Sequence, residues 1–232
     1  MRAAAPLLGV MIAGAFGCGS AEPPPASVSD GGVDVEVEDL GVDVRAPTVR
    51  VLGLEYVHGD GRTIDLESHL RSRDVRRVIH LAAVIEPPRG MIEDELEDIE
   101  VGGTRRVIEA CVATGVRHLT LTSSGAAYGY HSRNDGHLLT EDEATAGSPD
   151  FAYSRHKAAV ESLVARTRRL HPELGVLLLR PGTILGAGTN NQITALFTGR
   201  IVMTFREADP PFVFIWDEDV AQVIIAGALS ER

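Results

Sequence analysis

Between residues 40 and 180 the chain alternates short apolar segments, typical of β-strands, with longer segments of helical spacing. The strand-like segments are 40–45, 54–58, 75–83, 116–122 and 174–179, and the helix-like segments are 65–73, 93–114 and 151–171. Strands that alternate with helices predict a parallel, doubly wound α/β sheet. In such a sheet, ligands bind beyond the carboxyl ends of the strands.

Two of these segments carry further local predictions. The segment 174–179 is a continuous apolar run, which predicts a strand buried on both faces. The segment 93–114 has its apolar residues on one stripe, as in a single amphipathic helix. Gly115 follows it directly and is the expected C-cap, whereas Cys111 within it is expected to be a small buried hydrophobe.

Residues 1–32 admit two interpretations, and the first is a bacterial lipoprotein signal. Met1-Arg2 is followed by an apolar run, then by Cys18 and a tail rich in Pro, Ser, Asp and Gly. Phe16, a large aromatic residue close to the cleavage position, fits this interpretation poorly.

The second interpretation is a first strand over Leu7–Ala13 that runs into a glycine turn at Gly14, Gly17 and Gly19. Glycines there let the backbone approach a pyrophosphate, and the next helix N-terminus holds the anion. Three prolines at 23–25 interrupt that helix. We favour the strand, because the strands at 40–45 and 75–83 need one between them.

Tyr153 and Lys157 are the most informative polar pair in the sequence. They lie four residues apart in a helical segment and therefore share one face of the helix. An ammonium held beside a phenol favours the phenolate, which makes Tyr153 a candidate acid/base. Lys157 is the only lysine among 22 basic residues, and an arginine would not reproduce its compact charge. Ser124 follows the strand at 116–122, so parallel topology should bring it to the same crevice.

Composition excludes several other classes of function. The 232 residues are 44% hydrophobic and 24% charged, as in an ordinary globular protein. The net charge of −11 argues against a nucleic-acid partner. The two cysteines make neither a disulfide framework nor a metal site, and no histidine cluster has ligand spacing. His156 and His171 are expected on the solvated surface of the helix at 151–171.

Five short motifs occur in a fixed order along the chain. They are His80-Leu81-Ala82-Ala83, Ser123-Ser124-x-x-x-Tyr128-Gly129, Tyr153-x-x-x-Lys157, Arg180-Pro181-Gly182 and Trp216-Asp217-Glu218-Asp219-Val220-Ala221. In this order they resemble the extended short-chain dehydrogenases/reductases, in the NAD-dependent epimerase/dehydratase branch near UDP-glucose 4-epimerase-like members. The resemblance covers about Leu40 to Leu229.

The resemblance implies a Rossmann domain that binds NAD, with NADP as a second option, over residues 33–180 and a partial substrate-binding region over 181–232. By this resemblance, Tyr153 would be the acid/base, Lys157 would bind the nicotinamide ribose and Ser124 would hydrogen-bond the substrate oxygen. The remaining cofactor contacts implied are Gly14, Gly17 and Gly19 at the pyrophosphate, Asp43 at the ribose, Asp60 at the adenine, Leu81 and Ala82 along the cofactor, and Pro181 near the nicotinamide. Arg45 could instead favour a 2′-phosphate.

The chemistry implied is reversible hydride and proton transfer at a hydroxyl of a nucleotide sugar. A homodimer built from the helices at 93–114 and 151–171 is also expected. The implied location is cytoplasmic, with a lipoprotein anchored through Cys18 as the alternative. The alternative function is a non-catalytic NAD(P)-binding relative.

Three departures from the family pattern bear on that alternative. Glu100 stands where the family usually has an asparagine that helps a water link the lysine to solvent, which puts proton relay in doubt. The glycine turn is irregular. If the chain ends at Arg232, much of the substrate-binding portion of an extended member is missing.

Overall fold

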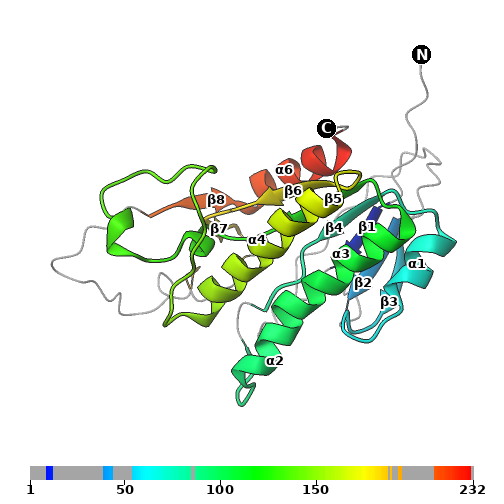
Figure 1. Ribbon diagram of the computed structural model, residues 1–232, viewed down its shortest axis with the longest axis horizontal. Coiled ribbons are helices and arrows are strands. Elements are labelled where there is room, and N and C mark those ends of the chain that lie inside the picture. Colours follow the sequence, from blue (N-terminus) through cyan, green and yellow to red (C-terminus); the bar gives the residue numbers. More distant parts are fainter. Residues whose placement is uncertain are drawn as a thin grey trace.

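The computed structural model describes residues 9–12, 39–43, 54–84, 87–187, 189, 193–194 and 212–230. These residues build a six-stranded sheet of order β3-β2-β1-β4-β5-β6, in which every pairing is parallel (Figure 1). The strands are β1 (Gly9–Ile12), β2 (Asp39–Asp43), β3 (Leu54–His58), β4 (Arg77–His80), β5 (His118–Thr122) and β6 (Gly175–Leu179). The predicted doubly wound parallel sheet is confirmed.

The central position in this sheet belongs to β1. Val10 is in register with Leu40 of β2 on one side and with Val78 of β4 on the other. Without β1, the facing edges of β2 and β4 would leave backbone N–H and C=O groups unpaired. The expected first strand is therefore observed for four residues of the range 7–13. The glycine turn at 14–19 lies outside the described residues.

Helices cover both faces of the sheet (Figure 1). They are α1 (Leu66–Ser72), α2 (Glu93–Glu97), α3 (Gly103–Thr114), α4 (Ala152–Leu170) and α6 (Asp217–Leu229). One hydrophobic core joins α1, α3 and α4 to the sheet, and Val176 and Leu178 of β6 pack against it. Leu177 lies between them and contacts α6 at Gly227. Because neighbouring strand residues point to opposite faces, α6 covers the other face. Within the described part of the chain, no helix is long and apolar enough to span a bilayer.

The predicted helix at 93–114 is interrupted by a π-helical turn. Between α2 and α3 the turn η1 (Asp98–Gly102) has i→i+5 hydrogen bonding. Such a turn shifts the phase of the side chains that follow it. As a result Glu100 is buried, although it lies in a run of otherwise exposed acidic residues. At the other end, Gly115 adopts φ +75°, as predicted for the C-cap.

The prediction that residues 174–179 are buried on both faces is wrong. All five residues of β6 are only half-buried, whereas Leu119 and Leu121 of the neighbouring β5 are 0% and 1% exposed. The reason is position, because β6 is the last strand in the sheet order and, among the described strands, pairs with β5 alone. A separate two-stranded parallel sheet follows, formed by β7 (Thr183–Leu185) and β8 (Phe214–Trp216).

Candidate functional site

Ser124 sits in a tight turn at the carboxyl end of β5. Its backbone is extended and its Oγ accepts a hydrogen bond from the Ala126 N–H at 3.1 Å, which caps the short 3₁₀-helix η2 (Gly125–Tyr128). The neighbouring Gly125 N–H donates to the Pro181 carbonyl at 3.1 Å. The turn after β5 is therefore tied to the segment that follows β6.

The first turn of α4 is fixed against η2 by Ser154. Its hydroxyl donates to the Ala126 carbonyl at 2.5 Å and accepts from the Ser148 N–H at 2.9 Å. Ser154 is completely buried. Because Tyr153 directly precedes it, the tyrosine's backbone is held next to the turn that carries Ser124.

Lys157 lies beside the ring of Tyr153, as their helical spacing predicts. The Lys157 Nζ is 5.4 Å from the centre of the Tyr153 ring. The same Nζ is 3.0 Å from Glu100 Oε2, and both side chains are almost completely buried, at 4% and 3% exposure. The second Glu100 oxygen accepts a hydrogen bond from the Val84 N–H. The loop after β4, the π-helical turn η1 and the helix α4 thus meet at a single buried ammonium.

His80, at the carboxyl end of β4, lies close to this ion pair. The Thr104 hydroxyl donates to the Glu100 carbonyl at 2.7 Å and lies 3.1 Å from His80 Nε2. Because the Thr104 hydroxyl hydrogen points to the Glu100 carbonyl, the Thr104 oxygen can only accept from His80. Nε2 is therefore the ring nitrogen of His80 that carries the hydrogen. Among the described residues, no group lies within hydrogen-bond distance of the buried Nδ1. Burial, together with the charge of Lys157, lowers the pKa of His80 to about 4.

We expect this depressed pKa to make the fold less stable in mild acid. The unfolded histidine takes up a proton near its ordinary pKa of 6.5, whereas the folded one does so near 4. The contribution of His80 is therefore complete above pH 6.5 and is lost as the pH falls toward 4, by about 3 kcal/mol. Urea unfolding of the wild type and His80→Gln at neutral pH and near the folded pKa checks this. The stability advantage of the wild type should shrink in acid, and an unchanged difference would contradict the assignment.

A second buried ion pair lies on the same side of α4. Arg180 binds Glu161 through three contacts of 2.6–3.0 Å. Glu161 also accepts a hydrogen bond from the Ser123 hydroxyl at 2.6 Å. Arg180 further donates to the Tyr128 hydroxyl at 2.7 Å, and its guanidinium carbon lies 4.8 Å from the centre of that ring. This network ties together the ends of β5 and β6 and the turn η2, around Ser124.

The other predicted cofactor contacts that the structure describes lie at the carboxyl ends of the strands. Asp43 is the last residue of β2, and Leu81 and Ala82 are half-buried directly after β4. Asp60 follows β3, and its carboxylate binds the Arg62 guanidinium at 2.6 Å. That hydrogen-bonded arginine lowers the pKa of Asp60. Gly14, Gly17 and Gly19 lie outside the described residues.

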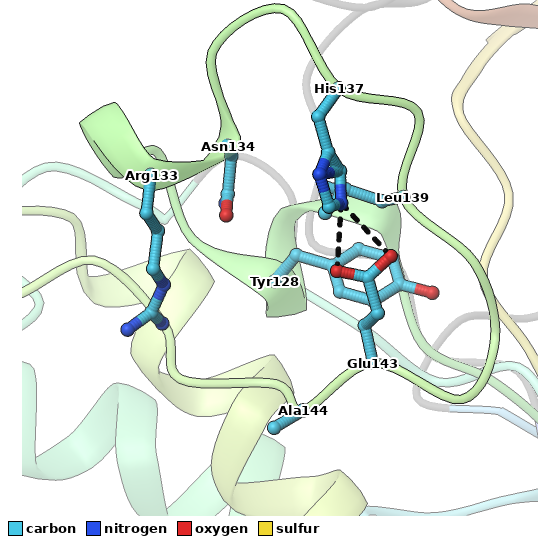
Figure 2. A pocket seen from close by; sticks show the side chains of 7 residues that line it. All are labelled: Tyr128, Arg133, Asn134, His137, Leu139, Glu143 and Ala144. Carbon is cyan, nitrogen blue, oxygen red and sulfur yellow. Dashed lines mark hydrogen bonds and ion pairs between the residues drawn. The ribbon is translucent and has the colours of Figure 1, made fainter.

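A pocket of about 290 Å³ lies in the loop that follows η2 (Figure 2). It is lined by Tyr128, Arg133, Asn134, His137, Leu139, Glu143 and Ala144. His137 Nε2 contacts both oxygens of Glu143, at 3.1 and 2.9 Å. The pocket shares Tyr128 with the network around Arg180, but neither Tyr153 nor Lys157 lines it.

One carboxylate near the site, Glu161, was not predicted to belong to it. Glu161 lies four residues after Lys157 and so shares its helix face, a spacing that could have indicated it. Glu100 stands at the position that the family resemblance associates with the lysine, but its direct contact with Lys157, across 57 residues of sequence, was not predicted. The prediction that His156 is solvated is wrong, because it is 4% exposed on the inward face of α4.

Comparison with known proteins agrees with the fold and the order of the motifs. The sequence model of the NAD dependent epimerase/dehydratase family matches residues 36–226. An uncharacterized protein of Mycobacterium bovis is 25% identical over 198 residues, which make up 83% of this chain and 52% of that protein. The 3 beta-hydroxysteroid dehydrogenase/Delta 5-->4-isomerase of Vaccinia virus is 27% identical over 168 residues, 71% of this chain and 48% of the viral protein.

Among solved structures, MoeE5 in complex with UDP-glucose and NAD is 26% identical, with a TM-score of 0.67. The match covers 82% of this chain and 63% of MoeE5. This chain spans about half the length of the curated relatives it matches, the mycobacterial and the viral protein. The family match covers most of the chain and confirms the resemblance found in the motifs. The chain belongs to the NAD dependent epimerase/dehydratase family.

Proposed function

We propose that the chain binds NAD, or NADP, and acts as a nucleotide-sugar epimerase/dehydratase-like oxidoreductase with Ser124, Tyr153 and Lys157 as its catalytic residues. The observation that carries this proposal is the buried Lys157 ammonium, 5.4 Å from the centre of the Tyr153 ring. The hydrogen bond of Ser154 to Ala126 holds that tyrosine's backbone beside the Ser124 turn. MoeE5, whose structure contains UDP-glucose and NAD, supports the class of substrate and cofactor.

The residues at the carboxyl edge of the sheet fit a dinucleotide. The backbone after β4 carries the half-buried Leu81 and Ala82, against which a flat ring could lie. Asp43 ends β2, where an acid can accept hydrogen bonds from ribose hydroxyls. Bound NAD would supply hydride acceptance and return at one carbon of the sugar.

The chain's own residues would move the proton. Tyr153 would remove the proton of a sugar hydroxyl as its carbon is oxidised, and would return it when the transient ketone is reduced. Lys157 would stabilise the phenolate form and contact the nicotinamide ribose. Ser124 would hold the substrate oxygen within reach of the tyrosine, so that positioning supplies much of the rate.

A non-catalytic NAD(P)-binding protein is the second candidate. The contact between Glu100 and Lys157 favours it, because a carboxylate 3.0 Å from the ammonium offsets part of the charge that would stabilise a phenolate. This candidate predicts cofactor binding without turnover.

An activity assay separates the two candidates. The purified chain is incubated with NAD or NADP and with UDP-glucose, UDP-glucuronic acid or a 3β-hydroxysteroid, and products are identified by NMR. The proposed function predicts conversion of at least one UDP-sugar. Cofactor binding with no conversion of any of them would favour the non-catalytic protein. Conversion of the steroid alone would keep the oxidoreductase and exclude the sugar substrate.

The remaining assignments stay predictions. Residues 33–180 would form the cofactor domain and 181–232 part of the substrate-binding region. The homodimer through the helical segments 93–114 and 151–171 and the location in the cell are likewise predictions from the sequence.

A further inference from the structure

Among the ion pairs of the described residues, the pair formed by Lys157 and Glu100 is the most deeply buried. The side chains are 4% and 3% exposed, and Nζ lies 3.0 Å from Oε2. An ammonium removed from water is strongly disfavoured unless a counter-ion and hydrogen bonds compensate. Lys157 is also the only lysine in the sequence, so the charge at this position is not one of many exchangeable surface charges.

The other titratable groups around Lys157 do not replace Glu100 as its counter-ion. His80 from β4 faces the ammonium, but its pKa of about 4 leaves it neutral near neutral pH. Asp98 on the π-turn binds Arg106 at 2.8 Å and is half-exposed. On α4 itself, Tyr153 presents its ring to the ammonium and Glu161 is bound to Arg180.

The carboxylate of Glu100 is bound at both oxygens, by the Val84 N–H and by Lys157, and the backbone of Glu100 is fixed as well. The π-turn directs the residue into the protein, and the Val84 N–H donates to Oε1. The Thr104 hydroxyl binds the carbonyl of the same residue at 2.7 Å. A carboxylate fixed in this way can hold the ammonium without having to reorganise during a reaction.

We infer that Glu100 is a positioning residue that keeps Lys157 in its ammonium form beside Tyr153. Without the carboxylate, burial would drive Lys157 to release its proton at a lower pH, and Tyr153 would lose its neighbouring cation. The structural part of this inference stands on the ion pair alone. Its consequence for turnover rests on the proposed function.

Because the chain has one lysine, the inference can be tested by NMR without any activity assay. Lysine labelled with nitrogen-15 at Nζ gives one side-chain ammonium signal, whose chemical shift reports protonation. In Glu100→Gln we expect the midpoint of this titration to fall by at least about one pH unit relative to the wild type. Asp98→Asn removes the same charge from the same turn and should leave the midpoint unchanged.

Glu100→Asp tests whether the charge rather than the exact side-chain shape matters. It keeps a carboxylate, so the midpoint of the titration should return most of the way to the wild-type value. Backbone amide spectra of each variant establish that it is folded over the pH range used, and Glu100→Asn replaces Glu100→Gln if the latter unfolds. Equal midpoints in the wild type and a folded neutral variant would overturn the inference. A midpoint that falls equally in Asp98→Asn would overturn it as well, because the effect would then be one of net charge.

If the chain also turns over a sugar, the loss of activity at alkaline pH should move to lower pH in Glu100→Gln, in parallel with the NMR midpoint. A shifted NMR titration with no activity in either protein would contradict the proposed function and leave the role of Glu100 intact. If the NMR titration shifts but the loss of activity at alkaline pH stays at the same pH, Glu100 stabilises the ammonium without affecting turnover.

Discussion

Tyr153→Phe is expected to lower turnover by about 10²- to 10⁴-fold and to leave NAD(P) binding unchanged. The substitution removes one hydroxyl and retains the ring. The centre of that ring lies 5.9 Å from the centre of the Phe151 ring and 5.4 Å from Lys157 Nζ. Packing should therefore survive, and the loss should fall on the proton-transfer step. Steady-state kinetics with the best UDP-sugar, beside calorimetric binding of the cofactor, measures the two effects separately.

Tyr130→Phe provides a matched control, because it removes a hydroxyl from another ring that contacts Phe151. Tyr130 is 73% exposed, and its variant should keep wild-type turnover. Lys157→Arg should reduce both turnover and cofactor binding, since a wider guanidinium cannot fit the buried position of the ammonium. Equal turnover in the wild type and Tyr153→Phe would show that Tyr153 is not the acid/base.

Glu161→Ala is expected to destabilise the fold by about 3–5 kcal/mol. The substitution leaves the mostly buried Arg180 guanidinium without its counter-ion and deprives the Ser123 hydroxyl of its acceptor. For a chain of this size, such a loss lowers the melting temperature by about 10 °C. Urea unfolding followed by circular dichroism gives the free energy directly.

Glu173→Ala is the matched control for that experiment. Glu173 lies just beyond the end of α4 and pairs with His171, but its side chain is 67% exposed. Exposed pairs of this kind contribute little to stability, so the control should unfold close to the wild type. A double variant with Arg180→Ala should lose less stability than the sum of the single changes. If Glu161→Ala unfolds like Glu173→Ala, the network around Arg180 does not stabilise the fold.

The sheet could be predicted because its signals are local and repeated. The segments 54–58 and 116–122 have the composition of strands. The helical spacing at 151–171 marks a helix between the strand at 116–122 and the strand at 174–179. The position of Lys157 beside Tyr153 was predictable for the same reason, since a helix fixes the geometry of residues four apart.

Features that depend on distant contacts could not be read in the same way. A continuous apolar run such as 174–179 does not reveal whether its strand lies in the middle of a sheet or at the end, so the exposure of β6 was missed. The π-turn interrupts a segment whose spacing fits a single helix, and it turns Glu100 inward toward a lysine 57 residues away. His156 is buried by packing that its polar neighbours in the sequence do not indicate.

Calorimetric titration of NAD and NADP into the purified chain tests whether the carboxyl edge of the sheet, with Lys157 and Tyr153 beside it, binds a nicotinamide dinucleotide. We expect saturable binding of at least one of the two cofactors, weakened in Lys157→Arg and retained in Tyr153→Phe. Absence of binding by both cofactors to the folded chain would contradict the oxidoreductase and the non-catalytic alternative together.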